Sequence, residues 1–166
     1  MKLSTALPVA LVVVLLDQVS KFVITRWLPL GAERNVIPGI FRLTHTRNRG
    51  IAFGLFPSAG QGFQLALLIA IATIVVVVAW QLARTSDDSL ARFGLALVLG
   101  GAIGNVIDRL AHGEVVDFLC FFIVAGGREH QWPSFNLADS AITIGAGCLI
   151  LAEILFTRRA HASRSH

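Results

Sequence analysis

The sequence predicts an all-α membrane protein of four transmembrane helices with a small extracytoplasmic β-sheet and loop region. Hydrophobic residues make up 55% of the 166 residues, and the mean hydropathy is +0.72, which is too apolar for an ordinary soluble domain. The apolar residues also gather in four long runs. We therefore expect one integral membrane domain over 1–166, with spans at about 3–25, 63–83, 92–109 and 138–156 and connections at 27–62 and 110–137.

The first span carries two charged residues, Asp17 and Lys21. They are four residues apart and share a helix face, and neither belongs on a lipid-facing surface. Two interpretations fit: a structural ion pair that orders the bundle, or a direct part in chemistry. The run is interpreted as a span rather than a cleaved signal peptide, because it has no small-residue cleavage site and its helical pattern continues through Asp17.

The first connection, at 27–62, contains several prolines and glycines, which exclude long helices. Alternating apolar and polar residues at 34–46 predict a small sheet lying against the bilayer surface. Asn48 and Gly50 follow this segment. Asn48 is able to hydrogen-bond a carboxylate or a backbone group, although loop asparagines are commonly turn residues, and Gly50 permits a tight turn.

The third span ends and the fourth begins with matching quartets, Asn105-x-x-Asp108 and Asn136-x-x-Asp139. At this spacing Asn and Asp share a helical face. An Asp at a helix N-terminus is also favoured by the helix dipole, which suits Asp139. The third span also carries glycines that allow a neighbouring helix to approach closely, at Gly100, Gly101 and Gly104.

Asp117, within Val115-Val116-Asp117-Phe118, and Asp139 have no adjacent basic residue, whereas Asp108 is followed by Arg109. Two carboxylates forced together in an apolar setting share a proton, so one acts as a base on water and the other as an acid. That chemistry requires neither a metal nor a cofactor. The alternative is that both acids are satisfied polar residues at a water interface. The remaining candidates have no ligand or nucleophile spacing: His45, His112, His130 and Cys120.

The charged residues favour lipid over nucleic acid as a partner. The net charge is only +4, and the basic residues are scattered along the borders of the apolar runs, where anionic lipid headgroups account for them. The short turn between the second and third spans and the C-terminal tail, which contains arginines and no acids, favour a cytoplasmic side for both termini.

Five short blocks occur in order along the four apolar runs, and together they resemble the bacterial lipoprotein signal peptidases, a family of intramembrane aspartic proteases. The resemblance implies that Asp117 and Asp139 are catalytic. It implies supporting polar roles for Asn48, Asn105, Asp108, Arg109, Asn136, Asp17 and Lys21, and a lid or close approach to substrate at Gly50, Ala52 and Phe53. The blocks are Asp17-Gln18-Val19-Ser20-Lys21, Asn48-x-Gly50-x-Ala52-Phe53, Gly104-Asn105-x-x-Asp108-Arg109, Gly113-x-Val115-Val116-Asp117-Phe118 and Phe135-Asn136-x-Ala138-Asp139-Ser140.

The resemblance further implies that the substrate is a prolipoprotein carrying diacylglycerol on a cysteine, cleaved on the amino side of that cysteine without a cofactor or metal. It places the enzyme in the bacterial inner membrane, with an extracytoplasmic active site that peptides of the globomycin type would block. Ile51 stands where the family often has Ala, and Arg47 and Arg49 flank Asn48 with two charges. From the residues alone, a proton-coupled small membrane transporter using the same acids and a structural membrane subunit remain alternatives.

Overall fold

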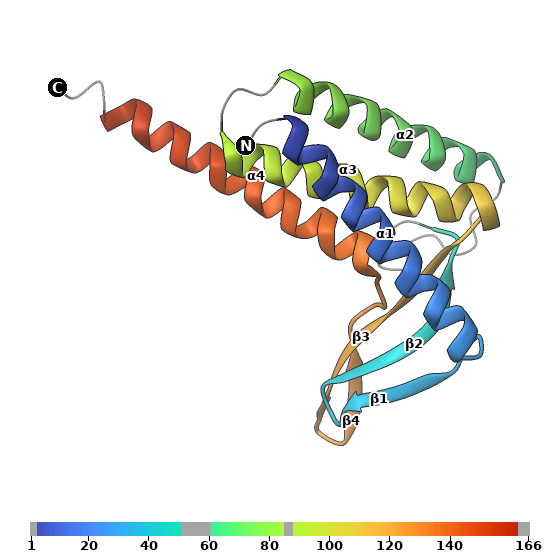
Figure 1. The fold of residues 1–166 in the computed structure, drawn as a ribbon. Coiled ribbons are helices and arrows are strands. Elements are labelled where there is room, and N and C mark those ends of the chain that lie inside the picture. Colours follow the sequence, from blue (N-terminus) through green and yellow to red (C-terminus); the bar gives the residue numbers. More distant parts are fainter. Residues whose placement is uncertain (1–2, 51–60, 85–87, 163–166) are drawn as a thin grey trace.

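The computed structural model describes residues 3–50, 61–84 and 88–162. Four helices lie side by side, and a four-stranded sheet lies beyond one end of the bundle (Figure 1). α1 begins and α4 ends at the other end of the bundle, away from the sheet (Figure 1). The helices are α1 (Leu3–Trp27), α2 (Gln61–Arg84), α3 (Ser89–His112) and α4 (Leu137–Ala162), and the strands are β1 (Glu33–Ile37), β2 (Phe41–Asn48), β3 (Val115–Ala125) and β4 (Arg128–Gln131).

α3 is the central helix and packs against the other three. Its glycines allow backbone-to-backbone contact, as the sequence predicted. A Cβ atom added at Gly101 would clash with the carbonyl oxygen of Ala138 in α4, and one added at Gly100 would lie 2.6 Å from that of Ala10 in α1. These two contacts hold the start of α4 and the middle of α1 directly against α3.

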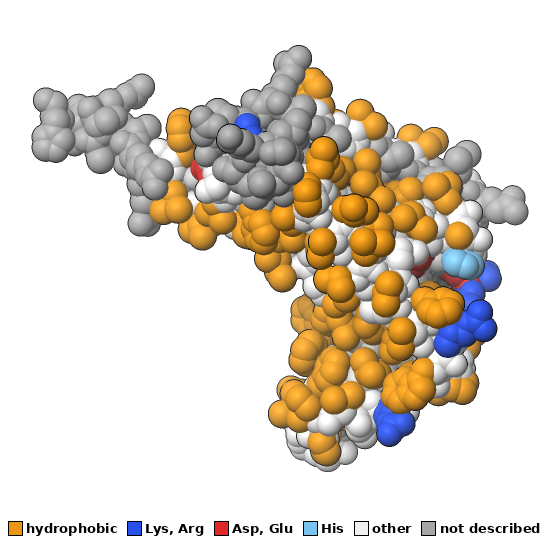
Figure 2. Space-filling view, viewed as in Figure 1, with side chains coloured by type: hydrophobic (Ala, Val, Ile, Leu, Met, Phe, Trp, Pro, Cys, Tyr) orange, Lys and Arg blue, Asp and Glu red, His pale blue; other side chains and the backbone are white. Residues whose placement is uncertain are grey.

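Within the described part of the chain, three helices are long and apolar enough to cross a membrane, at Ala6–Trp27, Ser89–His112 and Leu137–Thr157. α2 contributes a shorter apolar stretch, Ile69–Val78. Hydrophobic side chains cover the visible face of the helices and continue over the sheet (Figure 2). The fold is therefore that of a membrane protein, and the predicted count of four spans stays a prediction.

Three of the helices extend beyond the predicted spans at both ends, and α1 extends beyond its span only at its C-terminal end. α3 begins at Ser89 rather than at 92, because the Asp88 side chain caps it by accepting hydrogen bonds from the backbone nitrogens of Leu90 (2.9 Å) and Ala91 (3.2 Å). α4 continues past the predicted end at 156 to Ala162, because the basic residues that follow contain no helix breaker. Hydropathy marks where a run is apolar and not where its helix ends.

The structure confirms the predicted small sheet, and the sheet extends beyond the predicted segment at 34–46. Its strands are antiparallel in the order β1-β2-β3-β4, and only the first two come from the predicted segment at 34–46. The second connection, for which no strand was predicted, supplies β3 and β4. Gly126 and Gly127 link them with φ angles of 59° and 73°, the left-handed pair that a tight hairpin turn requires.

The register of β2 against β3 places a polar group next to Asp117. Thr46 lies opposite Asp117, and Asn48 lies opposite Val115. Since neighbouring side chains on one face of a sheet project together, Asn48 reaches the Asp117 side chain. On β2, buried Arg42 lies 3.9 Å from the centre of the Phe122 ring and forms ion pairs with Glu33 and Glu129, so one side chain ties all four strands.

Candidate active site

A buried charge cluster lies where α1, α3 and α4 meet. The Lys21 ammonium lies 2.8 Å from Asp17 Oδ2 and 2.9 Å from Asp108 Oδ2, and all three side chains are at most 4% exposed. The predicted pair of Asp17 and Lys21 is therefore confirmed. The cationic partner of Asp108 is Lys21 and not its sequence neighbour Arg109, because successive side chains on a helix point in different directions.

The cluster holds the start of α4 in place. Asp17 Oδ1 accepts a hydrogen bond from the backbone nitrogen of Ala138 at 3.0 Å. Gln18 Nε2 donates to Asp108 Oδ1 at 3.0 Å and to the Gly104 carbonyl at 3.1 Å. Sequence reasoning assigned no role to Gln18. The only sequence feature that pointed to Gln18 was its position next to Asp17 in the first of the five blocks that resemble the family. Buried charges are costly unless paired and hydrogen-bonded, and these contacts meet that requirement.

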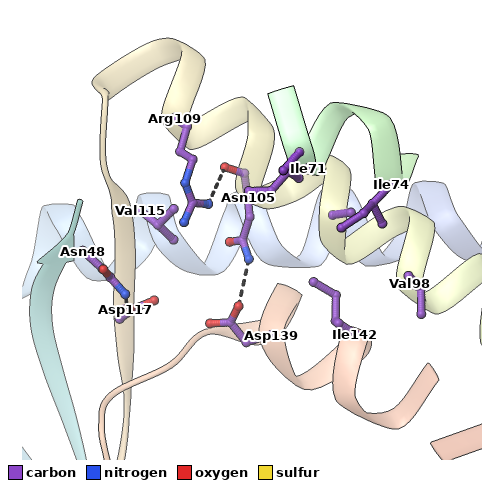
Figure 3. Close-up of a pocket in the computed structure, with 12 residues that line it drawn as sticks. Asn48, Ile71, Ile74, Val98, Asn105, Arg109, Val115, Asp117, Asp139 and Ile142 are labelled. Carbon is purple, nitrogen blue, oxygen red and sulfur yellow. Dashed lines mark hydrogen bonds between the residues drawn. The ribbon is translucent and has the colours of Figure 1, made fainter. Parts of the chain in front are cut away.

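Asn136 and Asp139 form a reciprocal cap at the N-terminus of α4. Asn136 Oδ1 accepts from the backbone nitrogen of Asp139 at 2.9 Å, and Asp139 Oδ2 accepts from the backbone nitrogen of Asn136 at 3.3 Å. This is a capping box built from Asn and Asp. Asn105 Nδ2 donates to the other oxygen of Asp139 at 2.8 Å (Figure 3). The Asp139 carboxylate thus accepts two hydrogen bonds, and both donors belong to the predicted quartets.

Asn136 also holds Asp117. Its Nδ2 donates to Asp117 Oδ1 at 2.8 Å, while Asn48 Nδ2 donates to Asp117 Oδ2 at 3.1 Å. Asn136 is fully buried, so a single fixed amide contacts both aspartates. Asp108 Oδ2 accepts from the backbone nitrogen of Val116 at 3.2 Å, which fixes the strand that carries Asp117 to the charge cluster.

Burial and the nearby charge of Asp139 raise the pKa of Asp117 from its usual value of 3.8 to about 7, although the hydrogen bonds from Asn48 and Asn136 act in the opposite direction. Asp117 is only 3% exposed. This carboxyl group consequently gains or loses its proton near neutral pH.

Asp117 and Asp139 line one cavity of about 270 Å³ between α2, α3 and α4 (Figure 3). The aspartates lie at its polar end together with Asn48, Asn105 and Arg109, and apolar side chains form the rest of the wall: Ala70, Ile71, Ile74, Val98, Ala102, Val115 and Ile142. An amphipathic cavity of this kind accepts a polar reacting group joined to an apolar one.

Arg109 connects the cavity to the loop after β2. Its guanidinium donates to the Asn105 carbonyl at 3.3 Å and to the Gly50 carbonyl at 2.9 Å. Gly50, one of the predicted close-approach residues, is thus adjacent to the site. The other two, Ala52 and Phe53, lie outside the described residues, as does the remainder of the predicted lid.

His45, His112, His130 and Cys120 are not among the described residues that line this cavity. His45 is buried with Nδ1 2.7 Å from the Leu28 carbonyl oxygen, His112 ends α3, and His130 lies exposed on β4. Cys120 is buried within β3. In residues 3–50, 61–84 and 88–162, no three His, Cys, Asp or Glu side chains gather as metal ligands would.

Comparison with known proteins gives a consistent result. A family model described as signal peptidase (SPase) II matches residues 9–155. A lipoprotein signal peptidase of Cupriavidus necator is 44% identical over 151 residues, which cover 90% of this chain and 83% of the relative. One of Ralstonia nicotianae is 45% identical over 149 residues, covering 88% and 82%.

Solved structures give the same picture. One structure of a bacterial membrane enzyme aligns with a TM-score of 0.79 and 32% identity, over 93% of this chain and 90% of the other. A second structure of a bacterial membrane enzyme aligns with a TM-score of 0.75 and 32% identity, over 90% and 92%. Both similarities extend over the helices and the sheet.

Proposed function

Because the chain belongs to the signal peptidase II family, whose members remove signal peptides from prolipoproteins, we propose that it does so as an aspartic endopeptidase with Asp117 and Asp139 as the catalytic pair. One observation supports this above all others. The two carboxylates line the same cavity, and both accept hydrogen bonds from Asn136: Asp117 from its buried side-chain amide and Asp139 from its backbone nitrogen. The supporting roles of the surrounding polar residues are part of the same proposal.

The two aspartates differ in environment, and this suggests their roles. Asp139 accepts hydrogen bonds at the N-terminus of α4, an arrangement that stabilises a carboxylate and suits a base. Asp117, with a pKa of about 7, holds the shared proton. Asp139 takes a proton from water as the water oxygen attacks the scissile carbonyl carbon, and Asp117 gives its proton to the carbonyl oxygen.

The tetrahedral intermediate then collapses. Asp139 delivers its proton to the leaving nitrogen, the carbon–nitrogen bond breaks, and Asp117 recovers a proton from a hydroxyl of the intermediate. The products are the carboxylic acid of the signal peptide and the free amine of the cysteine, and both aspartates return to their starting state. No metal or cofactor takes part in these steps.

The form of the cavity supports a lipidated substrate. A diacylglyceryl group on the cysteine can remain among the lipids beside the helices, where each buried methylene contributes about 0.8 kcal/mol. This anchor holds the bond on the amino side of the cysteine at the polar end of the cavity. The same cavity would accept peptides of the globomycin type, and the sheet would pair with the signal peptide through main-chain hydrogen bonds.

In this proposal the chain crosses the bacterial inner membrane four times. Both termini are cytoplasmic, and the sheet and the catalytic pair are extracytoplasmic. The arrangement agrees with the placement of the sheet at the opposite end of the bundle from the start of α1 and the end of α4 (Figure 1).

No observation favours a proton-coupled transporter or a structural subunit over this peptidase. A transporter requires polar groups that continue along the bundle. The described buried core at the end away from the sheet is instead formed by apolar residues, Ala6, Ala10, Leu95, Ala96 and Leu99.

The test is cleavage of a purified, diacylglyceryl-modified prolipoprotein by wild-type protein and by Asp117→Asn and Asp139→Asn variants. General acid–base catalysis contributes about 10²–10⁴-fold, so each variant should lose at least that much activity while keeping its fold. Asp88→Asn, at the exposed cap of α3, is the matched control and should cleave normally. Cleavage that survives either substitution would remove that aspartate from the mechanism.

A further inference from the structure

A second cavity meets the first at Asp117. Its volume is about 310 Å³, and Asn48 and Asp117 line both cavities. The first cavity has walls from three helices. The described lining of the second cavity comes from β2, the residue just after β2, Asp117 in β3 and the segment before α4. These residues are Thr46, Arg47, Asn48, Arg49, Asp117, Pro133 and Ser134. The second cavity therefore leads from Asp117 along the sheet instead of into the bundle.

Two arginines give this second cavity a basic rim. Arg47 Nη1 lies 2.7 Å from Glu114 Oε1, and Arg49 Nε lies 3.2 Å from Glu114 Oε2. Hydrogen bonds from the two arginines lower the pKa of Glu114 although its partial burial acts to raise it, so Glu114 is ionised at neutral pH. One carboxylate therefore faces two guanidinium groups, and the three side chains together carry a net charge of +1.

Glu114 also restrains both arginines. The Glu114 side chain is only 13% exposed, whereas those of Arg47 and Arg49 are 36% and 66% exposed. A side chain that is already held in place loses less entropy when it binds a ligand. The rim thus presents an accessible, positioned positive charge beside the catalytic pair.

The following inference rests on the proposed function. At the scissile bond the substrate has three branches: the signal peptide, the diacylglyceryl group and the hydrophilic mature chain. Only the mature chain must leave the bilayer for water, and a cavity that leads along the sheet under a basic rim suits it. We propose that this second cavity binds the first residues of the mature lipoprotein, and that Arg47 and Arg49 favour an acidic side chain after the lipidated cysteine.

The test uses two diacylglyceryl-modified substrates that differ only in the residue after the cysteine, Asp in one and Lys in the other. The wild type should cleave the Asp substrate with a kcat/KM roughly fivefold higher, because weak, solvent-screened charge interactions of opposite sign act on the two substrates. The ratio should shrink towards one in about 1 M salt, where the Debye length falls to ~3 Å.

Variants at Arg49 separate the rim from general effects on catalysis. Arg49→Gln should bring the ratio close to one, Arg49→Lys should retain the preference, and Arg49→Glu should invert it. Arg128→Gln, an identical change at an exposed position in β4, is the control and should leave the ratio unchanged. The ratio is insensitive to variants that fold less well, because both substrates meet the same active fraction.

Two results would overturn the inference alone: equal kcat/KM values for the two substrates in the wild type, or a preference for Asp that persists in Arg49→Glu. If the wild type cleaves neither substrate, and mass spectrometry shows both to be lipidated, the proposed function fails and the inference fails with it.

Discussion

Replacing Asn48 by Leu should shift the pH profile of the enzyme towards alkaline pH. Asn48 Nδ2 donates to Asp117 Oδ2 at 3.1 Å, and this bond stabilises the ionised form and lowers the pKa of Asp117. The proposed mechanism needs Asp117 protonated, so kcat/KM falls as the pH rises through a pKa of about 7. Removing the donor destabilises the carboxylate, which raises this pKa and extends activity to higher pH.

The size of the shift follows from the hydrogen bond. A bond to a charged group contributes about 1.5–3 kcal/mol, and one pKa unit corresponds to about 1.36 kcal/mol. Asn48 is half-buried, so water replaces part of the lost interaction, and we expect a shift of roughly one unit.

The assay is kcat/KM for one lipidated substrate measured across about pH 5 to 9, because kcat/KM reports the pKa values of the free enzyme. Asn35→Leu, an exposed position on β1, should leave the profile unchanged. A lower overall rate does not affect the reasoning, since the midpoint is read independently of the maximum. The reasoning would be refuted if the alkaline midpoint of the pH profile in Asn48→Leu equals that of the wild type or lies below it.

Three further predictions concern stability and topology. Asp108→Asn removes a buried partner of Lys21, so it should lower the free energy of unfolding by about 3–5 kcal/mol and reduce both the amount of folded protein and the activity. A well-folded but inactive variant would show that Asp108 acts in the chemistry. Gly101→Ala should lower the free energy of unfolding, measured thermally or chemically, by about 1–3 kcal/mol, because the added methyl group clashes with α4. Gly147→Ala, with nothing within 4 Å of the added Cβ, should be neutral or stabilising. Equal effects of the two substitutions would contradict the close packing of α3 and α4. In a chain lacking its own cysteines, an impermeant thiol reagent outside intact cells should label a cysteine at position 35, in β1, but not one at position 164, and the reverse pattern would overturn the proposed orientation.

The sequence was most informative where a local rule applies. Hydropathy located the helices, and the i,i+4 spacing identified the pair of Asp17 and Lys21, later found 2.8 Å apart. The Asn-x-x-Asp quartet at the start of α4 reflects a capping box, a contact within one helical turn.

One missed feature, the partner of Asp108, depends on long-range packing. The partner of Asp108 is on a different helix, and no local pattern relates it to Lys21. β3 was missed for another reason. Its residues, VVDFLCFFIVA, form a nearly continuous apolar run, and such a run does not distinguish a buried strand from a buried helix segment. The Gly126-Gly127 pair that follows is a hairpin signal, and it would have favoured the strand.

The capping box at the start of α4 also has a consequence for where the enzyme cuts. Asp139 lies in the first turn of a helix whose apolar stretch continues to Thr157, so the level of this carboxylate in the bilayer is tied to the position of α4. A helix rises about 1.5 Å per residue, and a mismatch between its apolar length and the hydrocarbon thickness is met by tilting or by local deformation of the lipid. In the proposed mechanism, the cleavage site on a lipid-anchored substrate is then set by its height above the membrane midplane as well as by its sequence. In bilayers of different thickness, the same substrate would reach Asp139 with its scissile bond at a different height.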